Sequence, residues 1–156
     1  MPDLNAFSTD SLCTMISSPD WLRELDHTAD IGIAVQADDL KTLFERAAHG
    51  MLSLLTDIES VEAKITRDVR ASGGDLQELM RNWLSEVNFL HIQEHLVFRT
   101  FEITSFTEQE LAATIAGESI DRERHDIFTE IKAVTYHGLS IEKENGLWHA
   151  EIIFDM

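Results

Sequence analysis

The sequence predicts a single α+β domain in which mostly antiparallel β-strands pack against two main amphipathic helices. Apolar residues recur with a helical period in two stretches and alternate with polar residues in several shorter ones. Between the last two alternating stretches lies Asn145-Gly146, the dipeptide that a tight hairpin turn favours. Helices set among strands that are joined by hairpins are typical of the α+β class.

The 156 residues are enough for one domain with a sizeable core, and 44% of them are hydrophobic, as in ordinary globular proteins. Residues 1–19 are polar, rich in Ser and without Lys or Arg, so we expect a flexible N-terminal tail and no signal peptide. Residues 20–156 then form the domain. Since no apolar run reaches the ~18 residues of a membrane helix and Cys13 is the only cysteine, a cytoplasmic protein without membrane contact is expected.

The first part of the chain predicts two helices and two or three strands, because residues 21–26 and 30–36 could be one interrupted strand or two short ones. The first helix follows Asp38 and Asp39, either of which could cap its first turn. The second begins at Asp75, with Glu78 three residues later as in a capping box. The strand between the helices alternates apolar and charged residues, which indicates one exposed face. The expected ranges are strands 21–26, 30–36 and 61–71 and helices 40–56 and 75–93.

The rest of the chain changes to a period of two, so only strands are expected there. Asn145-Gly146 supplies the two positive φ angles that a type I′ turn needs, and it should join the last two strands as a hairpin. The expected strands cover residues 96–105, 109–118, 129–136, 138–144 and 147–154.

The chain is strongly acidic, with 12 Lys and Arg against 29 Asp and Glu and a net charge of −17. Direct nucleic-acid binding is not expected, because it depends on Lys and Arg that neutralise phosphates and the sequence has no local basic patch. The charge suits metal cations or a basic protein partner. A merely solvated acidic surface is the more general explanation.

A zinc-protease pattern, H-x-x-E-H, occurs as His91-Ile92-Gln93-Glu94-His95. It falls where the second helix ends, and His91 continues the apolar stripe of that helix. We therefore favour a helix end with polar histidines over a zinc site. No phosphate-binding glycine loop occurs in the sequence.

Two carboxylates stand at the ends of apolar strands. Asp30 comes directly before Ile31, where the apolar alternation of its strand begins, and Asp155 follows the last strand and precedes Met156. If Met156 is the C-terminus, its α-carboxylate lies next to the Asp155 side chain. These two anions would repel each other unless a cation, a basic partner or solvent relieved the repulsion. Hard oxygen ligands suit Ca²⁺, Mg²⁺ or Mn²⁺ better than Zn²⁺. A frayed, solvated chain end is the simpler alternative.

Two further side chains have both a plain and a functional interpretation. Lys132 lies beside Ala133 and Val134 in an apolar stretch, where a lysine usually points to solvent but could also serve a site. His137 belongs to Tyr136-His137-Gly138, which could be the turn that closes the preceding strand.

Four segments together resemble the archease family, over about residues 21 to 156. The segments are His27 to Ile33 (HTADIGI), Asn82 to Glu86 (NWLSE), Glu130 to Leu139 (EIKAVTYHGL) and Ile152 to Asp155 (IIFD). This resemblance implies a protein with no catalysis of its own. It would be a cofactor of an RtcB-type RNA-splicing ligase that promotes guanylylation of the ligase histidine and multiple turnover in tRNA splicing.

The resemblance also implies a divalent cation, most simply Ca²⁺, with Mg²⁺ or Mn²⁺ possible. Its metal ligands by position are Asp30, Asp155 and Met156. Lys132 matches the lysine of the family's KAVTYH motif and is the candidate activation residue. The remaining matched histidines, expected as outer-sphere or structural groups, are His27 and His137.

Two other classes of function stay open at this point. A metal-dependent hydrolase could use Asp30, His27 and His137, and it would turn over a substrate without any partner. A chaperone-like binding module would suppress aggregation broadly and would not depend on Asp30.

Overall fold

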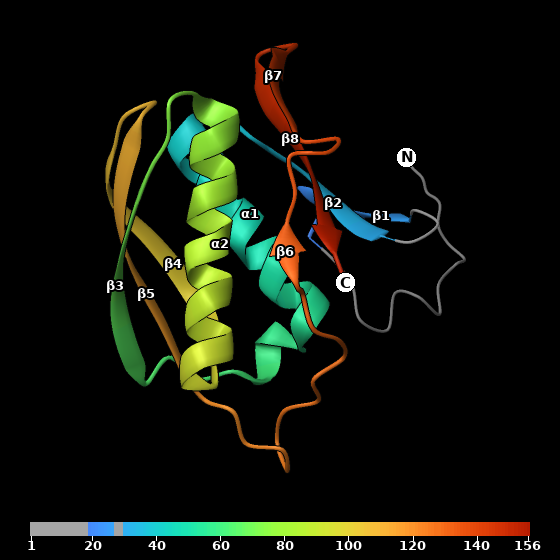
Figure 1. The fold of residues 1–156 in the computed structure, drawn as a ribbon, viewed down its shortest axis with the longest axis vertical. Helices are drawn as coiled ribbons and strands as arrows, with labels where there is room; N and C mark the ends of the chain where they lie inside the picture. Colours follow the sequence, from blue (N-terminus) through green and yellow to red (C-terminus); the bar gives the residue numbers. More distant parts are fainter. Residues whose placement is uncertain (1–18, 27–29) are drawn as a thin grey trace.

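The computed structural model describes residues 19–26 and 30–156 (Figure 1). Of the expected tail, residues 1–18 lie outside the described part. The order along the chain is β1 Leu22–Asp26, β2 Asp30–Ala37, α1 Leu40–Leu55, a 3₁₀ turn Ile58–Ser60, β3 Ile65–Ser72, α2 Leu76–Glu94, β4 Leu96–Phe106, β5 Glu110–Ser119, β6 Ala133–Val134, β7 Ser140–Glu144 and β8 Leu147–Asp155. Neither described helix is long and apolar enough to cross a membrane.

The strands form two antiparallel sheets with the helices between them, which confirms the predicted α+β class (Figure 1). One sheet has the order β1-β2-β8-β6, with β7 also paired to β8, and the other has the order β3-β5-β4. Helix α1 packs on β2 of the first sheet and on β4 of the second. Because β8 pairs with β2, β6 and β7, it is the central strand of the first sheet.

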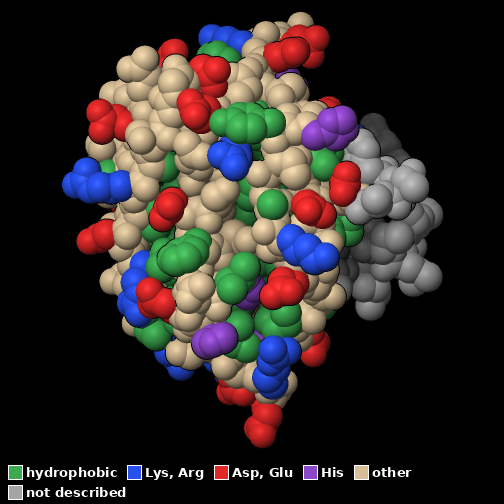
Figure 2. Space-filling model, viewed as in Figure 1, with side chains coloured by type: hydrophobic (Ala, Val, Ile, Leu, Met, Phe, Trp, Pro, Cys, Tyr) green, Lys and Arg blue, Asp and Glu red, His purple; other side chains and the backbone are tan. Residues whose placement is uncertain are grey.

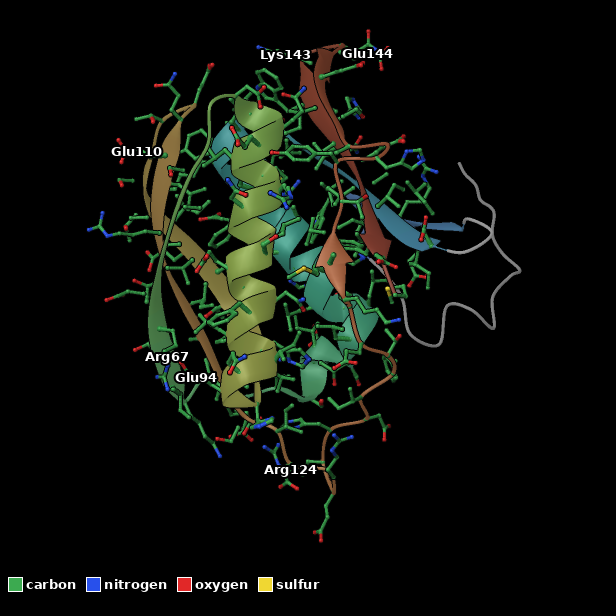
Figure 3. The ribbon with its side chains drawn as sticks, viewed as in Figure 1. Arg67, Glu94, Glu110, Arg124, Lys143 and Glu144 are labelled. Atoms are coloured by element: carbon green, nitrogen blue, oxygen red, sulfur yellow. The ribbon has the colours of Figure 1, made fainter. Side chains whose placement is uncertain are left out.

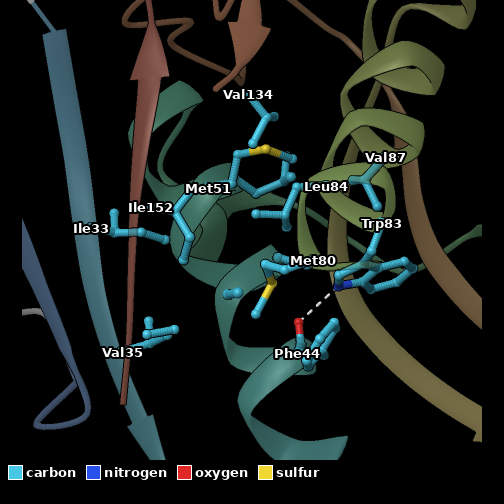
Figure 4. Close-up of a cluster of buried hydrophobic side chains, with 14 of the residues drawn as sticks. Ile33, Val35, Phe44, Met51, Met80, Trp83, Leu84, Val87, Val134 and Ile152 are labelled. Carbon is cyan, nitrogen blue, oxygen red and sulfur yellow. Dashed lines mark hydrogen bonds between the residues drawn. The ribbon is translucent and has the colours of Figure 1, made fainter. Parts of the chain in front are cut away.

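The core fills the space between the two sheets around α1 and α2, and Figure 4 shows part of it. Ile33 of β2 and Ile152 of β8 lie opposite each other and are fully buried against the helices. Trp83 of α2 is also fully buried, and its indole N–H donates a hydrogen bond to the carbonyl of Phe44 at 2.8 Å. This bond satisfies the one polar atom of the largest core side chain and joins the two helices.

The predicted caps and hairpin are confirmed. The Asp39 carboxylate accepts from the Thr42 N–H at 2.8 Å and begins α1, and Asp75 accepts from the Glu78 N–H at 2.8 Å and begins α2. The hairpin residue Asn145 has φ 55° between β7 and β8.

Two predicted strands are corrected. The strand expected over 129–136 is reduced to the two residues of β6, because the preceding residues 120–131, here called the strap, bond to the helices, and the Ile131 carbonyl accepts from the Asn88 side-chain amide of α2 at 2.9 Å. Within this strap the Phe128 N–H donates to the Leu55 carbonyl at 2.8 Å. The strand expected from residue 61 begins at Ile65, because Val61 still closes the 3₁₀ turn through a 3.2 Å bond to Ile58.

Candidate functional site

The sheet register brings the two predicted carboxylates together. Asp30 opens β2, Asp155 ends β8, and their Cα atoms are direct partners in the antiparallel pair. Directly opposite residues project from the same face with Cβ atoms about 5 Å apart. Two isolated acidic residues of the sequence therefore become neighbours at one end of the first sheet.

This carboxylate pair lies on the outer face of that sheet. The buried residues Ile33 and Val35 alternate along β2 and pack against α1. Side chains alternate between the two faces of a strand, so Asp30 points to the side away from the helices. Asp30 is partly exposed and Asp155 is exposed, so both can reach solvent or a docked partner.

Lys132 is held beside the same strand end by its backbone. Its N–H donates to the Asp155 carbonyl at 2.8 Å, and the next residue, Ala133, is the register partner of Asp155. The Lys132 side chain is exposed. The chain thus places the Lys132 backbone one residue away from the position opposite Asp155.

The other predicted site residues have different surroundings. Met156 packs its side chain against the core, so only its main-chain oxygens remain to face a cation. His27 lies outside the described residues. His137 is exposed in the turn from Tyr136 to Leu139, whose N–H donates back to the Tyr136 carbonyl at 3.1 Å. This turn closes the segment after β6, as the plain interpretation of His137 expected.

The same turn lies over the strand that carries Asp155. Gly138 has φ 75°, a value that favours glycine, and a Cβ there would lie 3.0 Å from Cγ1 of Ile153. The Thr135 hydroxyl donates to the Ile153 carbonyl at 3.1 Å. The segment Thr135–Gly138 therefore fixes β8 two residues before its terminal carboxylate.

The donor set fits an oxygen-preferring cation. Asp30 and Asp155 offer hard carboxylate oxygens from directly opposite positions, as Ca²⁺ and Mg²⁺ prefer. Within residues 19–26 and 30–156, no group of three or more His, Cys, Asp or Glu side chains converges as a complete metal cluster. A cation here would therefore draw part of its coordination from backbone oxygens, water or a partner.

The H-x-x-E-H segment lies at the end of α2, as expected. His91 is buried in α2 and its Nδ1 lies 2.7 Å from the Leu96 carbonyl, while burial lowers its pKa and favours the neutral ring. His95 ends the helix with φ 57°. Glu94 instead pairs with Arg67 of β3 at 2.8 Å (Figure 3). The helix end interpretation is confirmed.

Sequence reasoning missed a cluster of polar residues around the buried Glu118, here called the Glu118 clasp. Its members are Glu118 at the end of β5, Glu62, Arg124 and His125. The Glu118 carboxylate is 4% exposed, pairs with the Arg124 guanidinium, accepts from the Glu62 N–H at 2.7 Å and lies 3.0 Å from Nε2 of His125. The sequence signal for this cluster was Glu118 itself, because it is a glutamate at the end of a stretch of alternating apolar residues.

The charge on Glu118 is stabilised by these donors. Burial alone would raise the pKa of Glu118, but the hydrogen bonds from Glu62 and His125 and the Arg124 charge outweigh it and lower that pKa below its ordinary value. Nδ1 of His125 accepts from the Asp121 N–H at 2.9 Å, so the ring proton lies on Nε2 and points at Glu118. The clasp fixes the start of the strap and takes no part in the surface pair.

Comparison with known proteins defines the class. The model of the Archease protein family matches residues 22–156. The protein archease of Methanopyrus kandleri is 38% identical over 136 residues, which cover 85% of this chain and 97% of the relative. The protein archease of Pyrococcus abyssi is 40% identical over 135 residues, covering 84% of this chain and 95% of the relative.

Solved structures agree with this assignment. The solution structure of protein 1598 from Methanobacterium thermoautotrophicum superposes with a TM-score of 0.74 at 35% identity, over 87% of this chain and 99% of that one. A Thermotoga maritima crystal structure, described as an archease and possible chaperone, shares the fold with a TM-score of 0.61 at 20% identity, over 86% of this chain and 96% of that one. The chain belongs to the archease family.

Proposed function

We propose that this protein activates an RNA ligase of the RtcB type by docking on it. It promotes guanylylation and repeated turnover of the ligase in tRNA splicing, and it has no substrate of its own. The observation that supports this function is the juxtaposition of Asp30, Asp155 and Lys132 at one sheet end of an archease-family chain. A related fold described as a possible chaperone is consistent with action on a partner protein.

The chemistry of nucleotidyl transfer explains why such a surface could help. The reaction depends on positioning and on neutralising phosphate charge, and both can be completed by a second protein. Asp30 and Asp155 would hold a divalent cation, most simply Ca²⁺, which would supply positive charge when bound. Lys132 would bring its ammonium group to a phosphate oxygen or to a carboxylate of the ligase.

The surface charge supports a protein partner over RNA. A net charge of −17 complements a basic ligase face and repels phosphates. On the face in Figure 2, Lys and Arg side chains are interspersed with Asp and Glu and form no continuous basic patch. The ligase, which works in the cytoplasm in this proposal, would therefore make the RNA contacts.

The test is transfer of radiolabelled GTP to a purified RtcB-type ligase with and without this protein. Asp30→Asn, Asp155→Asn and Lys132→Met should each lower the stimulated rate at least about tenfold, because each removes a charge from the surface that docks. Glu142→Gln, an exposed carboxylate on β7, is the matched control and should stimulate fully.

Full stimulation by both Asp variants would contradict the proposal. Hydrolysis of a substrate by this protein alone would favour a metal-dependent hydrolase. Aggregation suppression that does not change in Asp30→Asn would favour a general chaperone-like module. Circular dichroism of each variant checks that the fold is retained.

A further inference from the structure

The peptide group between Ile131 and Lys132 is held from two sides. Its carbonyl accepts a hydrogen bond from the side-chain amide of Asn88 on α2 at 2.9 Å. Its N–H donates to the Asp155 carbonyl at the end of β8 at 2.8 Å. The C=O and N–H of a trans peptide point in opposite directions. One rigid unit therefore links α2 to the end of β8, just before β6 begins (Figure 1).

Asn88 is a polar side chain in apolar surroundings. It is 5% exposed, and its neighbour Val87 and the Ile131 side chain are both fully buried. A backbone carbonyl can only accept, so the amide turns its Nδ2 towards Ile131. The Asn88 Oδ1 is then buried with no hydrogen-bond partner among residues 19–26 and 30–156. A buried acceptor without a partner costs stability, so stability alone does not explain an asparagine here.

The held peptide sets the direction in which Lys132 leaves the backbone. The peptide unit is planar, so its orientation constrains ψ of Ile131 and φ of Lys132. The side chain of Lys132 is exposed, whereas Ile131 and Val134 on either side of it are buried. The direction of this lysine therefore depends on its backbone more than on packing of its own side chain.

We propose that Asn88 is a positioning residue for the surface pair: it holds the Ile131–Lys132 peptide against the Asp155 carbonyl and so directs the Lys132 side chain. The hydrogen bonds run in series from the Asn88 amide through the peptide to Asp155, and bonds in series polarise and strengthen one another. The effect on a ligase rests on the proposed function, whereas the effect on the backbone does not.

The variant Asn88→Leu tests this role, because leucine has a similar size but cannot donate a hydrogen bond. It loses the bond to Ile131 and also removes the buried Oδ1 that has no partner, so the urea midpoint should change little. Asn88→Ser, whose side chain is too short to reach the carbonyl, repeats the test with a polar residue.

The matched control is Asn82→Leu. Asn82 lies on the same helix and also donates its side-chain amide to a backbone carbonyl, that of Ser72, at 2.7 Å. Ser72 ends β3 in the other sheet. The control therefore removes the same kind of hydrogen bond without touching the peptide that carries Lys132.

Hydrogen exchange of the Lys132 backbone amide gives a readout that needs no ligase. In Asn88→Leu and Asn88→Ser this amide should exchange at least about tenfold faster than in the wild type, while amides of the sheet β3-β5-β4 keep their rates. Asn82→Leu should leave the Lys132 rate unchanged. Unchanged exchange of Lys132 in both Asn88 variants, or equal acceleration in Asn82→Leu, would overturn the proposal.

Stimulation of the ligase gives the second readout. Asn88→Leu should lower the maximum rate of GTP transfer at least about fivefold. Combined with Lys132→Met, it should lower the rate no further than Lys132→Met alone, because both changes act through one side chain. Losses that multiply would overturn the proposal. If the wild type does not stimulate at all, the proposed function fails, and the exchange rate of Lys132 still decides whether Asn88 holds the peptide.

Discussion

The two carboxylate sites of this acidic chain are built in opposite ways. Glu118 is buried and surrounded by donors, namely the Glu62 N–H, the His125 ring and the Arg124 guanidinium. Asp30 instead faces the carboxylate of Asp155 across two strands. Donors from within the protein fix the first site and leave it nothing further to bind. A like charge directly opposite destabilises the second site until a cation approaches.

The largest expected effect is loss of stability in Glu118→Gln. The change removes the anion that the Glu62 N–H and the His125 ring hydrogen-bond, and loss of hydrogen bonds to a charged group costs up to about 3 kcal/mol of unfolding free energy. Urea unfolding measures the loss. Glu59→Gln is the control, because Glu59 pairs with Arg99 at 3.3 Å but its side chain is 75% exposed, and it should cost under about 1 kcal/mol. Equal losses of unfolding free energy in Glu118→Gln and Glu59→Gln would contradict the contrast between a buried and an exposed carboxylate.

Acid should abolish the contribution of the Glu118 charge to the free energy of unfolding. Its pKa in the fold is lower than the ordinary value of 4.5, so ionisation favours the folded state. The contribution is complete above the unfolded pKa and disappears as the pH falls through the folded pKa. Unfolding free energies of the wild type and Glu118→Gln, measured from neutral pH into acid, should converge. A gap that is independent of pH would rule out this origin.

Calcium should stabilise the wild type through the surface pair. A ligand at a hundredfold its dissociation constant adds about 2.7 kcal/mol, so the melting temperature should rise with Ca²⁺ relative to EDTA. In Asp30→Asn and Asp155→Asn the rise should be lost, while stability in EDTA stays equal or increases slightly because repulsion is removed. Glu142→Gln should respond like the wild type. An unchanged calcium response in both Asn variants would contradict a cation at this site.

A smaller effect is expected at the turn over Ile153. Gly138 and Gly146 both have positive φ, so alanine at either should cost about 1 kcal/mol. Only at Gly138 does the new Cβ meet another side chain, Ile153. Gly138→Ala should therefore cost slightly more in thermal unfolding and also weaken the calcium response. Identical behaviour of the two variants would show that this turn does not support Asp155.

Local chemistry made much of the fold predictable. Asp39 and Asp75 were recognisable as caps, and Asn145 with its following glycine as a hairpin, because each acts on residues a few positions away. The strand expected over 129–136 was wrong outside β6, because the Phe128 N–H and the Ile131 carbonyl bond to the two helices, contacts that no local pattern encodes.

The two carboxylate sites also differ in how far the sequence could reveal them. Motif resemblance pointed to Asp30 and Asp155, and the sheet register brings them together. The Glu118 clasp depends on Glu62 and His125, which only the completed packing places beside Glu118. Whether a cation binds the surface pair stays a prediction.

The central position of β8 also determines when the first sheet can form during synthesis. It pairs with β2, β6 and β7 although it is the last strand of the chain. On the ribosome, all of the sheet β3-β5-β4 and both helices emerge before it, and a domain generally folds as a unit. β2 must wait for its neighbour until synthesis reaches residue 155. Nascent or shortened chains that lack β8 would thus expose Asp30 without Asp155, and the carboxylate pair would exist only after β8 has been made.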